Sequence, residues 1–170
     1  ENVLDELAVI FPFEVDCYKD TTLPVFFVGH PFTEPGFELA VRHDPAGPIL
    51  LLPGSRQAAV RRIFPALLAT AAALEGRGAG KDFVVLYPGE AIRGVLEQIL
   101  GGHPMEGRVR LAPVAAGSPA SAVLTSSGTM SLQCALAGVP GCVVYRAHPW
   151  TYLVGRRLVK IPYLGIANLL

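Results

Sequence analysis

Short runs of apolar residues alternate along this chain with longer stretches in which apolar positions recur every three or four residues. The short runs have the length of buried strands, and the longer stretches have the period of amphipathic helices. Such alternation is typical of an α/β fold, in which helices cover both faces of a parallel sheet. The predicted strands are 7–10, 25–28, 49–52, 83–87, 109–111, 122–124 and 142–145. The predicted helices are 14–19, 56–74, 90–100, 130–137 and 150–158.

A stretch rich in proline and turn residues separates two series of these elements. Residues 31–48 contain four prolines and have the composition of a linker. We therefore predict the remnant of one doubly wound domain at 1–30, a linker at 31–48 and most of a second domain at 49–170. The start at Glu1, without an initiator methionine, leads us to expect a fragment of a longer protein. Pro65 is expected to kink or divide the helix 56–74.

Charge is unevenly distributed although the formal net charge is zero. All 14 acidic residues lie at or before Glu106, so the first 106 residues carry 8 basic and 14 acidic side chains, a net charge of −6. The remainder carries six basic residues and no acid, a net charge of +6. Such a segment suits an anionic partner such as a diphosphate, a nucleic acid or a lipid surface. Chance segregation on a solvated face is the alternative.

Cysteine and histidine usage gives no sign of a metal centre. Cys17, Cys134 and Cys142 lie in apolar surroundings without a C-x-x-C spacing, so we expect reduced core residues of a cytosolic protein. The four histidines are scattered, which disfavours a zinc site. With 51% hydrophobic and 16% charged residues the chain is expected to be folded, and no apolar stretch reaches the ~18 residues of a membrane span.

The first candidate loop follows the strand 49–52. Gly54 allows a tight strand-to-helix turn, and Ser55 is expected to cap the helix that follows. Arg56 places a permanent cation in the first helical turn, where the helix dipole favours negative charge. A bound anion is one reason to retain an arginine there. A capped turn with a solvated Arg56 is the other interpretation.

The second candidate loop, Thr125-Ser-Ser-Gly-Thr129, follows the strand 122–124 and begins an apolar helix. Hydroxyls and backbone amides of Ser127, Gly128 and Thr129 could hold a phosphate. The alternative is an ordinary helix cap with two spare hydroxyls. Neither a Walker A loop nor a G-x-G-x-x-G pattern is present. Because both loops follow strands of one sheet, an anionic ligand is favoured.

Two further features of the sequence indicate a binding role less strongly than the two loops do. Tyr145 and Arg146 end the strand 142–145 and could line the same cleft, although for this pair taken alone a surface arginine after a core strand is the favoured interpretation. The segment 149–160 mixes aromatic and basic residues in a helical pattern. It could lie on an anionic membrane surface, but a helix with a core face and a basic outer face is the favoured interpretation. The residues that a membrane surface would contact are Trp150, Tyr152, Arg156, Arg157 and Lys160.

Seven motifs, in matching order and spacing from end to end, resemble the lipid-A-disaccharide synthase family, which are inverting glycosyltransferases with two Rossmann-like domains (the GT-B fold). The motifs are Pro12-Phe-Glu14, Phe27-Val-Gly-His-Pro31, Leu51-Leu-Pro-Gly-Ser-Arg56, Ser127-Gly-Thr129 with Leu132, Val143-Val-Tyr-Arg146, Arg156-Arg-Leu-Val-Lys160 and Asn168-Leu-Leu170.

The resemblance implies a Rossmann-like C-terminal domain that binds a UDP-sugar. It implies transfer of 2,3-diacylglucosamine from UDP to 2,3-diacylglucosamine 1-phosphate, without a metal or cofactor and without nucleic acid. The catalytic carboxylate is expected upstream of Glu1, so the fragment alone is expected to be inactive. The cytoplasm of a Gram-negative-type bacterium, at the inner face of its inner membrane, is the implied location, and a homodimer is left open. The implied substrate-binding residues are Gly54, Ser55, Arg56, Ser127, Gly128, Thr129, Gln133, Tyr145, Arg146 and Asn168.

Two positions depart from the family pattern. Gln133 stands where the family has a glutamate expected to hold the ribose hydroxyls, and Ala59 stands where another glutamate is expected. Gln133 would replace a charge-assisted hydrogen bond by a weaker neutral one. These departures leave open a divergent or non-catalytic paralogue, or another UDP-GlcNAc-using enzyme such as a transferase or a 2-epimerase.

Overall fold

The computed structural model describes residues 3–146, which form two compact units divided between Glu38 and Leu39. The division falls within the predicted linker 31–48. That segment is not wholly irregular: it holds a short 3-10 helix, η1 (Pro31–Thr33), and a strand, β3 (Val41–His43). β3 belongs to the second unit. The predicted helix 150–158 lies outside the described residues.

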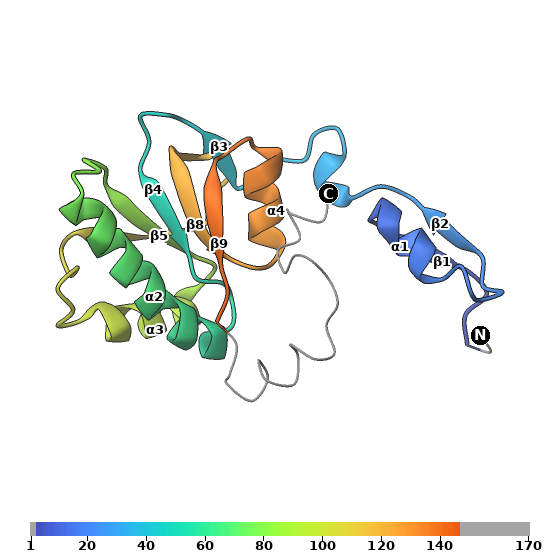
Figure 1. The fold of residues 1–170 in the computed structure, drawn as a ribbon, viewed down its shortest axis with the longest axis horizontal. Helices are drawn as coiled ribbons and strands as arrows, with labels where there is room; N and C mark the ends of the chain where they lie inside the picture. The colour runs from blue at the N-terminus through green and yellow to red at the C-terminus, as the bar shows by residue number, and fades with distance from the viewer. Residues whose placement is uncertain (1–2, 147–170) are drawn as a thin grey trace. The chain divides into compact units, whose positions relative to one another are not determined.

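The first unit is a small strand–helix–strand motif. Strands β1 (Leu7–Val9) and β2 (Val25–Phe27) pair in parallel, and α1 (Pro12–Cys17) connects them (Figure 1). Pro12 suits the first turn of α1, where its missing N–H costs nothing. A carboxylate oxygen of Glu14 accepts hydrogen bonds from the amides of Phe11 (2.9 Å) and Ile10 (3.2 Å), which caps the helix start.

The second unit is built on a five-stranded, wholly parallel sheet of order β6-β5-β4-β8-β9 (Figure 1). Its strands are β4 (Ile49–Leu52), β5 (Phe83–Tyr87), β6 (Val109–Pro113), β8 (Ala122–Ser126) and β9 (Gly141–Val144). Its helices are α2 (Gln57–Gly76), α3 (Glu90–Leu100) and α4 (Thr129–Leu136). The predicted α/β fold with a Rossmann-like parallel sheet is confirmed.

Both faces of the sheet are buried, which explains the continuous apolar runs of its central strands. Alternate residues of β4 face opposite sides: Leu51 packs with α2 and α3, whereas Leu50 packs with α4 and with β3. A second small parallel pair, β3 with β7 (Ser118–Ala120), covers part of the α4 side. The sequence did not predict these two strands.

The long helix α2 is continuous through Pro65, so the prediction that proline divides it is wrong. Pro65 lies on the exposed side, and the buried side carries a regular row of apolar residues. Packing of that row against the sheet holds the helix together across the missing backbone hydrogen bond. The buried residues of α2 are Val60, Ile63, Phe64, Leu67, Leu68 and Ala71.

The three cysteines differ in environment. All are free thiols, but only Cys134 on α4 is buried, and Cys17 and Cys142 are exposed. The prediction of three core cysteines is therefore wrong for two of them. Burial of Cys134 raises the pKa of its thiol to about 11, so it stays protonated at neutral pH.

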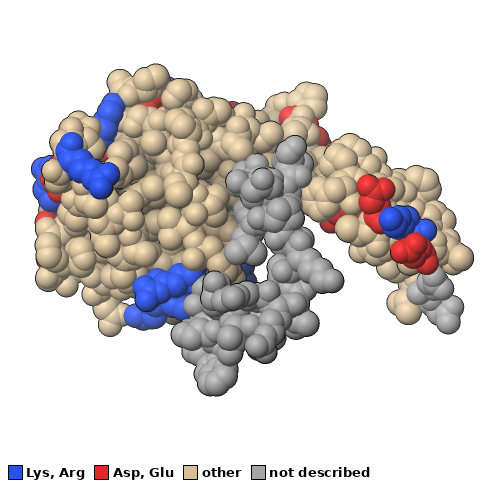
Figure 2. Space-filling view, viewed as in Figure 1, with Lys and Arg blue, Asp and Glu red and all other residues tan. Residues whose placement is uncertain are grey.

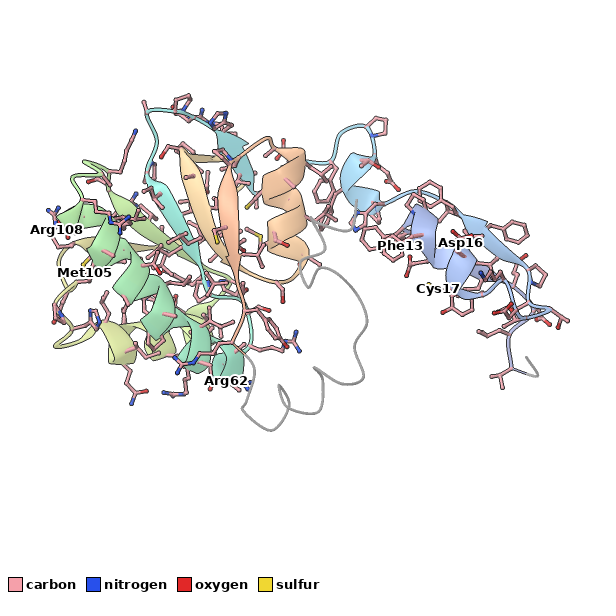
Figure 3. All side chains as sticks on the ribbon, in the orientation of Figure 1. Phe13, Asp16, Cys17, Arg62, Met105 and Arg108 are labelled. Carbon is pink, nitrogen blue, oxygen red and sulfur yellow. The ribbon has the colours of Figure 1, made fainter. Side chains whose placement is uncertain are left out.

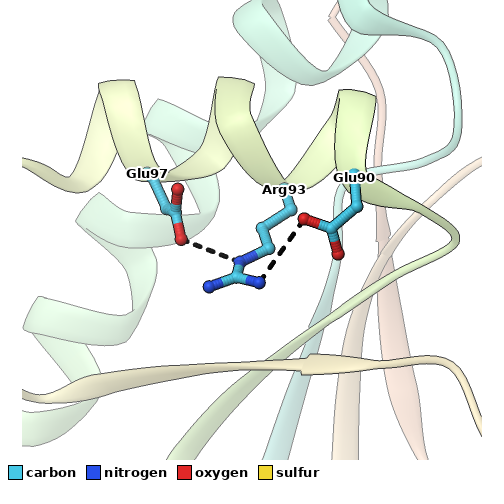
Figure 4. Close-up of polar contacts among 3 residues, drawn as sticks. All are labelled: Glu90, Arg93 and Glu97. Carbon is cyan, nitrogen blue, oxygen red and sulfur yellow. Dashed lines mark hydrogen bonds and ion pairs between the residues drawn. The ribbon is translucent and has the colours of Figure 1, made fainter.

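Surface ion pairs hold the outer helix α3. On α3 the guanidinium of Arg93 bonds Glu97 (2.8 Å) and lies 3.4 Å from Glu90 (Figure 4). These carboxylates raise the pKa of the Arg93 guanidinium. Such exposed pairs at helical spacing add little to the stability of a helix, because water and salt screen them.

Candidate functional site

The candidate site lies at the carboxyl ends of β4 and β8. These two strands are neighbours in the sheet, yet the chain leaves β4 toward β5 on one side and reaches β9 from β8 on the other. The strand order therefore reverses between them. In open parallel sheets, ligands bind at this switch point, outside the carboxyl ends of the strands.

The loop after β4 forms the first wall of the site. Gly54 has a φ of +106°, a conformation that residues with a side chain rarely adopt. Arg56 is the N-cap of α2, and no side chain caps that helix, so the prediction that Ser55 caps it is wrong. The amides of Gln57 and Ala58 consequently have no acceptor among the described residues.

The loop after β8 forms the second wall. Gly128, with a φ of +149°, is the N-cap of α4, and again no side chain caps the helix. The Thr125 hydroxyl donates to the carbonyl of Ser126 (3.0 Å) and the Ser131 hydroxyl to that of Gly128 (2.6 Å). In the part of the chain that the structure describes, no side chain accepts a hydrogen bond from the amides at the start of α4. Thr129 also contributes its own exposed hydroxyl.

The two loops meet. A methyl group built on Gly54 would lie 3.2 Å from the hydroxyl oxygen of Ser126, so Gly54 permits a close approach of the loops. Together they line an open cleft with a volume of about 990 Å³, to which the end of β9 adds Tyr145 and Arg146. Gly54 and Ser126 are 72 residues apart in the sequence (126 − 54), yet their strand-end loops line one site.

The cleft is electropositive. Three arginines line it, Arg56, Arg62 and Arg146, whereas none of its described lining residues is acidic. Figure 2 shows Lys and Arg atoms gathered over the N-terminal end of α2, at the lower edge of the sheet. Figure 3 labels Arg62 at the same end of the helix. The positive ends of two helix dipoles add to this field, so the site suits an anion.

No described residues form a cluster that could hold a metal ion. The site offers two kinds of group for a negatively charged ligand: arginine guanidinium cations and uncapped backbone amides at helix N-termini. Both recognise phosphate oxygens by hydrogen bonds and charge.

Comparison with known families identifies the relationship. The profile of the family described as Lipid-A-disaccharide synthetase matches residues 1–170, the whole of the chain.

The chain belongs to the Lipid-A-disaccharide synthetase family.

Curated relatives carry the same description. Lipid-A-disaccharide synthase of Geobacter sulfurreducens is 33% identical over 180 residues, which covers 99% of this chain and 46% of the relative. The protein of that name in Geobacter metallireducens is 34% identical with the same coverage. Lipid-A-disaccharide synthase 1 of Legionella pneumophila (strain Lens) is 33% identical over all of this chain and 47% of the relative. The chain spans about half the length of the curated relatives it matches.

Most of the residues that the family resemblance assigns to substrate binding are brought together by the fold. The eight that line the cleft are Gly54, Ser55, Arg56, Ser127, Gly128, Thr129, Tyr145 and Arg146. Asn168 lies outside the described residues. So do the five residues predicted to contact a membrane, Trp150, Tyr152, Arg156, Arg157 and Lys160.

Gln133 is the exception among the described candidates. It is not part of the cleft lining, and its side-chain oxygen accepts a hydrogen bond from the amide of Ala40 (2.9 Å). Gln133 thus ties α4 to the segment that leads into β3. Ala59, the other departure from the family pattern, does line the cleft, where its methyl group leaves room that a glutamate side chain would occupy.

Sequence reasoning missed Arg62 and the apolar wall of the cleft. Arg61 and Arg62 are adjacent cations in one helix, and the sequence does not separate them. In the structure Arg61 bonds the side chain of Gln98 on α3 (3.0 Å), while Arg62 lines the cleft. The apolar wall consists of four residues to which the sequence analysis gave no role in the site: Ile63, Leu86, Val114 and Met130.

Proposed function

We propose that this chain is the nucleotide-sugar-binding half of a lipid-A-disaccharide synthase. In this proposal the whole protein transfers 2,3-diacylglucosamine from UDP to the 6-hydroxyl of 2,3-diacylglucosamine 1-phosphate, releasing UDP. The membership of the family and the names of the curated relatives support the reaction.

One observation carries the proposal: two uncapped helix N-termini and Arg56 border a single cleft that has no carboxylate among its described lining residues. A UDP leaving group gains negative charge as its bond to the sugar breaks. Arg56 and the amides of Ser127, Gly128 and Thr129 would stabilise that charge at the diphosphate. Loss of one such donor typically costs about 2.7–4 kcal/mol of transition-state stabilisation.

The remaining chemistry would come from outside the described cleft. The general base that activates the acceptor hydroxyl is expected in the N-terminal half of the longer protein, since this chain spans about half of its relatives. No metal is needed, because arginines and amides would meet the diphosphate charge. Among residues 3–146 no helix is both long and apolar enough to cross a bilayer. We place the reaction at the inner face of the inner membrane, where the acylated substrates would lie.

Calorimetry with UDP and with uridine tests the nucleotide site. We expect wild type to bind UDP and to bind uridine far more weakly, because uridine lacks the diphosphate. Arg56→Ala should raise the Kd for UDP about 10- to 100-fold, the equivalent of one lost charge-assisted contact of roughly 1.5–3 kcal/mol. The affinity for uridine should not change.

Arg77→Ala is the matched control, because Arg77 is an exposed arginine at the opposite end of the same helix. Its Kd for UDP should stay within about twofold of wild type. Equal affinity for UDP and uridine, or equal losses in the two arginine variants, would refute a diphosphate site at Arg56. A product assay on the full-length protein then separates the synthase from other UDP-sugar enzymes and from an inactive relative.

A further inference from the structure

Among the three arginines of the described cleft lining, Arg62 is the one to which neither the sequence motifs nor the family resemblance gives a role. It lies on α2 in the face that borders the cleft, together with Ala58, Ala59 and Ile63. The cleft therefore extends along the side of α2, beyond the helix start. At 1.5 Å per residue, the backbone of Arg62 lies about 9 Å further along the helix axis than that of Arg56.

The guanidinium of Arg62 is held in place by its own helix. Its Nε atom donates a hydrogen bond to the carbonyl of Ala58 (3.1 Å), one turn earlier. This bond keeps the guanidinium over the first turn of α2, beside Ala58 and Ala59, and leaves the two terminal nitrogens for a ligand. An arginine oriented in this way loses little side-chain entropy when it binds a planar or phosphate group.

No acid offsets this cation locally. The first turn of α2 has no acidic residue, and no ion pair of Arg62 occurs within residues 3–146. The neighbouring Arg61, in contrast, is occupied by Gln98. An anion bound at Arg62 would therefore supply this guanidinium with a charged partner.

The number of cations in the cleft exceeds what the proposed donor requires. In a UDP-sugar each phosphate carries one negative charge, which Arg56, Arg146 and the amides at the start of α4 can meet. A phosphomonoester adds roughly −1.5 to −2 at neutral pH. The acceptor in the proposed reaction carries such a group, and the Ala58–Ala59 face beside Arg62 has no bulky side chain to exclude it.

We propose that Arg62 binds the phosphomonoester of the acceptor sugar, so that the cleft holds two separate anionic groups. The inference rests on the proposed function, which supplies the acceptor's chemistry. Arg62 is then a specificity residue for the acceptor, and Arg56 serves the donor.

Steady-state kinetics on the full-length protein that carries this chain test the assignment. Arg62→Ala should raise the KM for the acceptor about tenfold or more, the loss of one charge-assisted contact, with the KM for the UDP-sugar within twofold of wild type. Arg62→Lys should recover part of the loss, since it restores the charge. Arg61→Ala is the matched control and should change neither KM.

Other kinetic outcomes overturn the assignment. A rise in the KM for the UDP-sugar would place Arg62 at the diphosphate. Unchanged KM values for both substrates in Arg62→Ala, or equal changes in Arg61→Ala and Arg62→Ala, would show that the acceptor phosphate does not bind at Arg62.

A binding experiment on the same full-length protein separates failure of this inference from failure of the proposed function. At saturating UDP, calorimetry should show that glucosamine 1-phosphate binds to wild type and binds about tenfold more weakly to Arg62→Ala. Arg56→Ala should instead weaken the binding of UDP. A wild-type protein that binds glucosamine 1-phosphate but not UDP would contradict the proposed function. Absence of glucosamine 1-phosphate binding, or equal affinity for inorganic phosphate, contradicts a sugar-phosphate site at Arg62.

Discussion

Arg56 and Gly54 illustrate how single residues define this site. Arg56 is a cation at a helix N-terminus, where the dipole favours anions, and it is the N-cap without a capping side chain. Gly54 holds the left-handed turn that lets the β4 loop approach Ser126. Both features are unfavourable or neutral for stability alone, and the anion that we propose to bind in the cleft would explain them.

Gly54→Ala should therefore affect stability and binding together. A side chain at a φ of +106° is strained, which we expect to lower the free energy of unfolding by about 1–3 kcal/mol. The added methyl group would also displace the Ser126 hydroxyl, 3.2 Å away, where the two loops approach each other, and we expect UDP binding to weaken about tenfold. Denaturant unfolding and calorimetry measure the two effects.

Gly78→Ala provides the comparison, because Gly78 has a φ of +78° and no neighbouring atom within 4 Å of an added methyl group. It should lose a similar amount of stability without any change in UDP affinity. If Gly78→Ala weakened UDP binding as much as Gly54→Ala, the effect would come from stability and the close approach of the loops would have no functional role.

At the scale of elements, α4 has two roles. Its N-terminus borders the cleft, and Gln133 in its second turn binds the backbone of Ala40 ahead of β3. The family pattern assigns this position to the ribose, but the structure directs its side-chain oxygen to Ala40. A glutamate at 133 could accept the same hydrogen bond and would strengthen it through its charge.

Gln133→Glu should accordingly leave the Kd for UDP within twofold of wild type. Gln133→Ala should lower the free energy of unfolding by about 1–3 kcal/mol, because it removes the hydrogen-bond acceptor of the part-buried Ala40 amide. Calorimetry measures the affinity for UDP and denaturant unfolding measures stability, and together they distinguish ribose binding from a structural hydrogen bond to Ala40. A gain of tenfold or more in UDP affinity in Gln133→Glu would return the residue to ribose binding.

The sequence predicts a helix or strand correctly where its apolar residues form a continuous run or recur with a clear helical period. Strands β4 and β5 and helix α3 lie where the apolar pattern predicts them. Strands β3 and β7 were missed because each has three residues and includes polar or proline positions, so pairing rather than composition defines them. The two loops of the site, which contain Gly54 and Gly128, follow strands that the sequence predicted. Only the order of the strands in the sheet shows that these two loops are neighbours.

At the scale of the whole molecule, charge in space differs from charge along the chain. The acid-free stretch after Glu106 contributes Arg146 to the described cleft, whereas Arg56 and Arg62 come from the acid-containing part. Arg108 pairs with Glu75, and Arg110 lines a small cavity of about 250 Å³ near Pro48 and Lys81. The net charges of the two sequence halves therefore did not predict which cations face the site.

The first unit ends at Glu38. Its two-stranded sheet leaves large apolar side chains such as Phe26, Phe27 and Val28 exposed. The prediction that residues 1–30 are the remnant of an N-terminal domain remains a prediction. The nucleotide site proposed above lies within the second unit and does not depend on it.

If the two strand-end loops bind one diphosphate together, the chemical shifts of their backbone amides report the binding in both loops. On titration of UDP, the amides of Gly54–Arg56 and of Ser127–Thr129 should shift with a single common Kd. The amides near Pro48 and Lys81, which line the other cavity, should not move. Shifts confined to one loop, different affinities for the two loops, or a response centred on the other cavity would contradict the account.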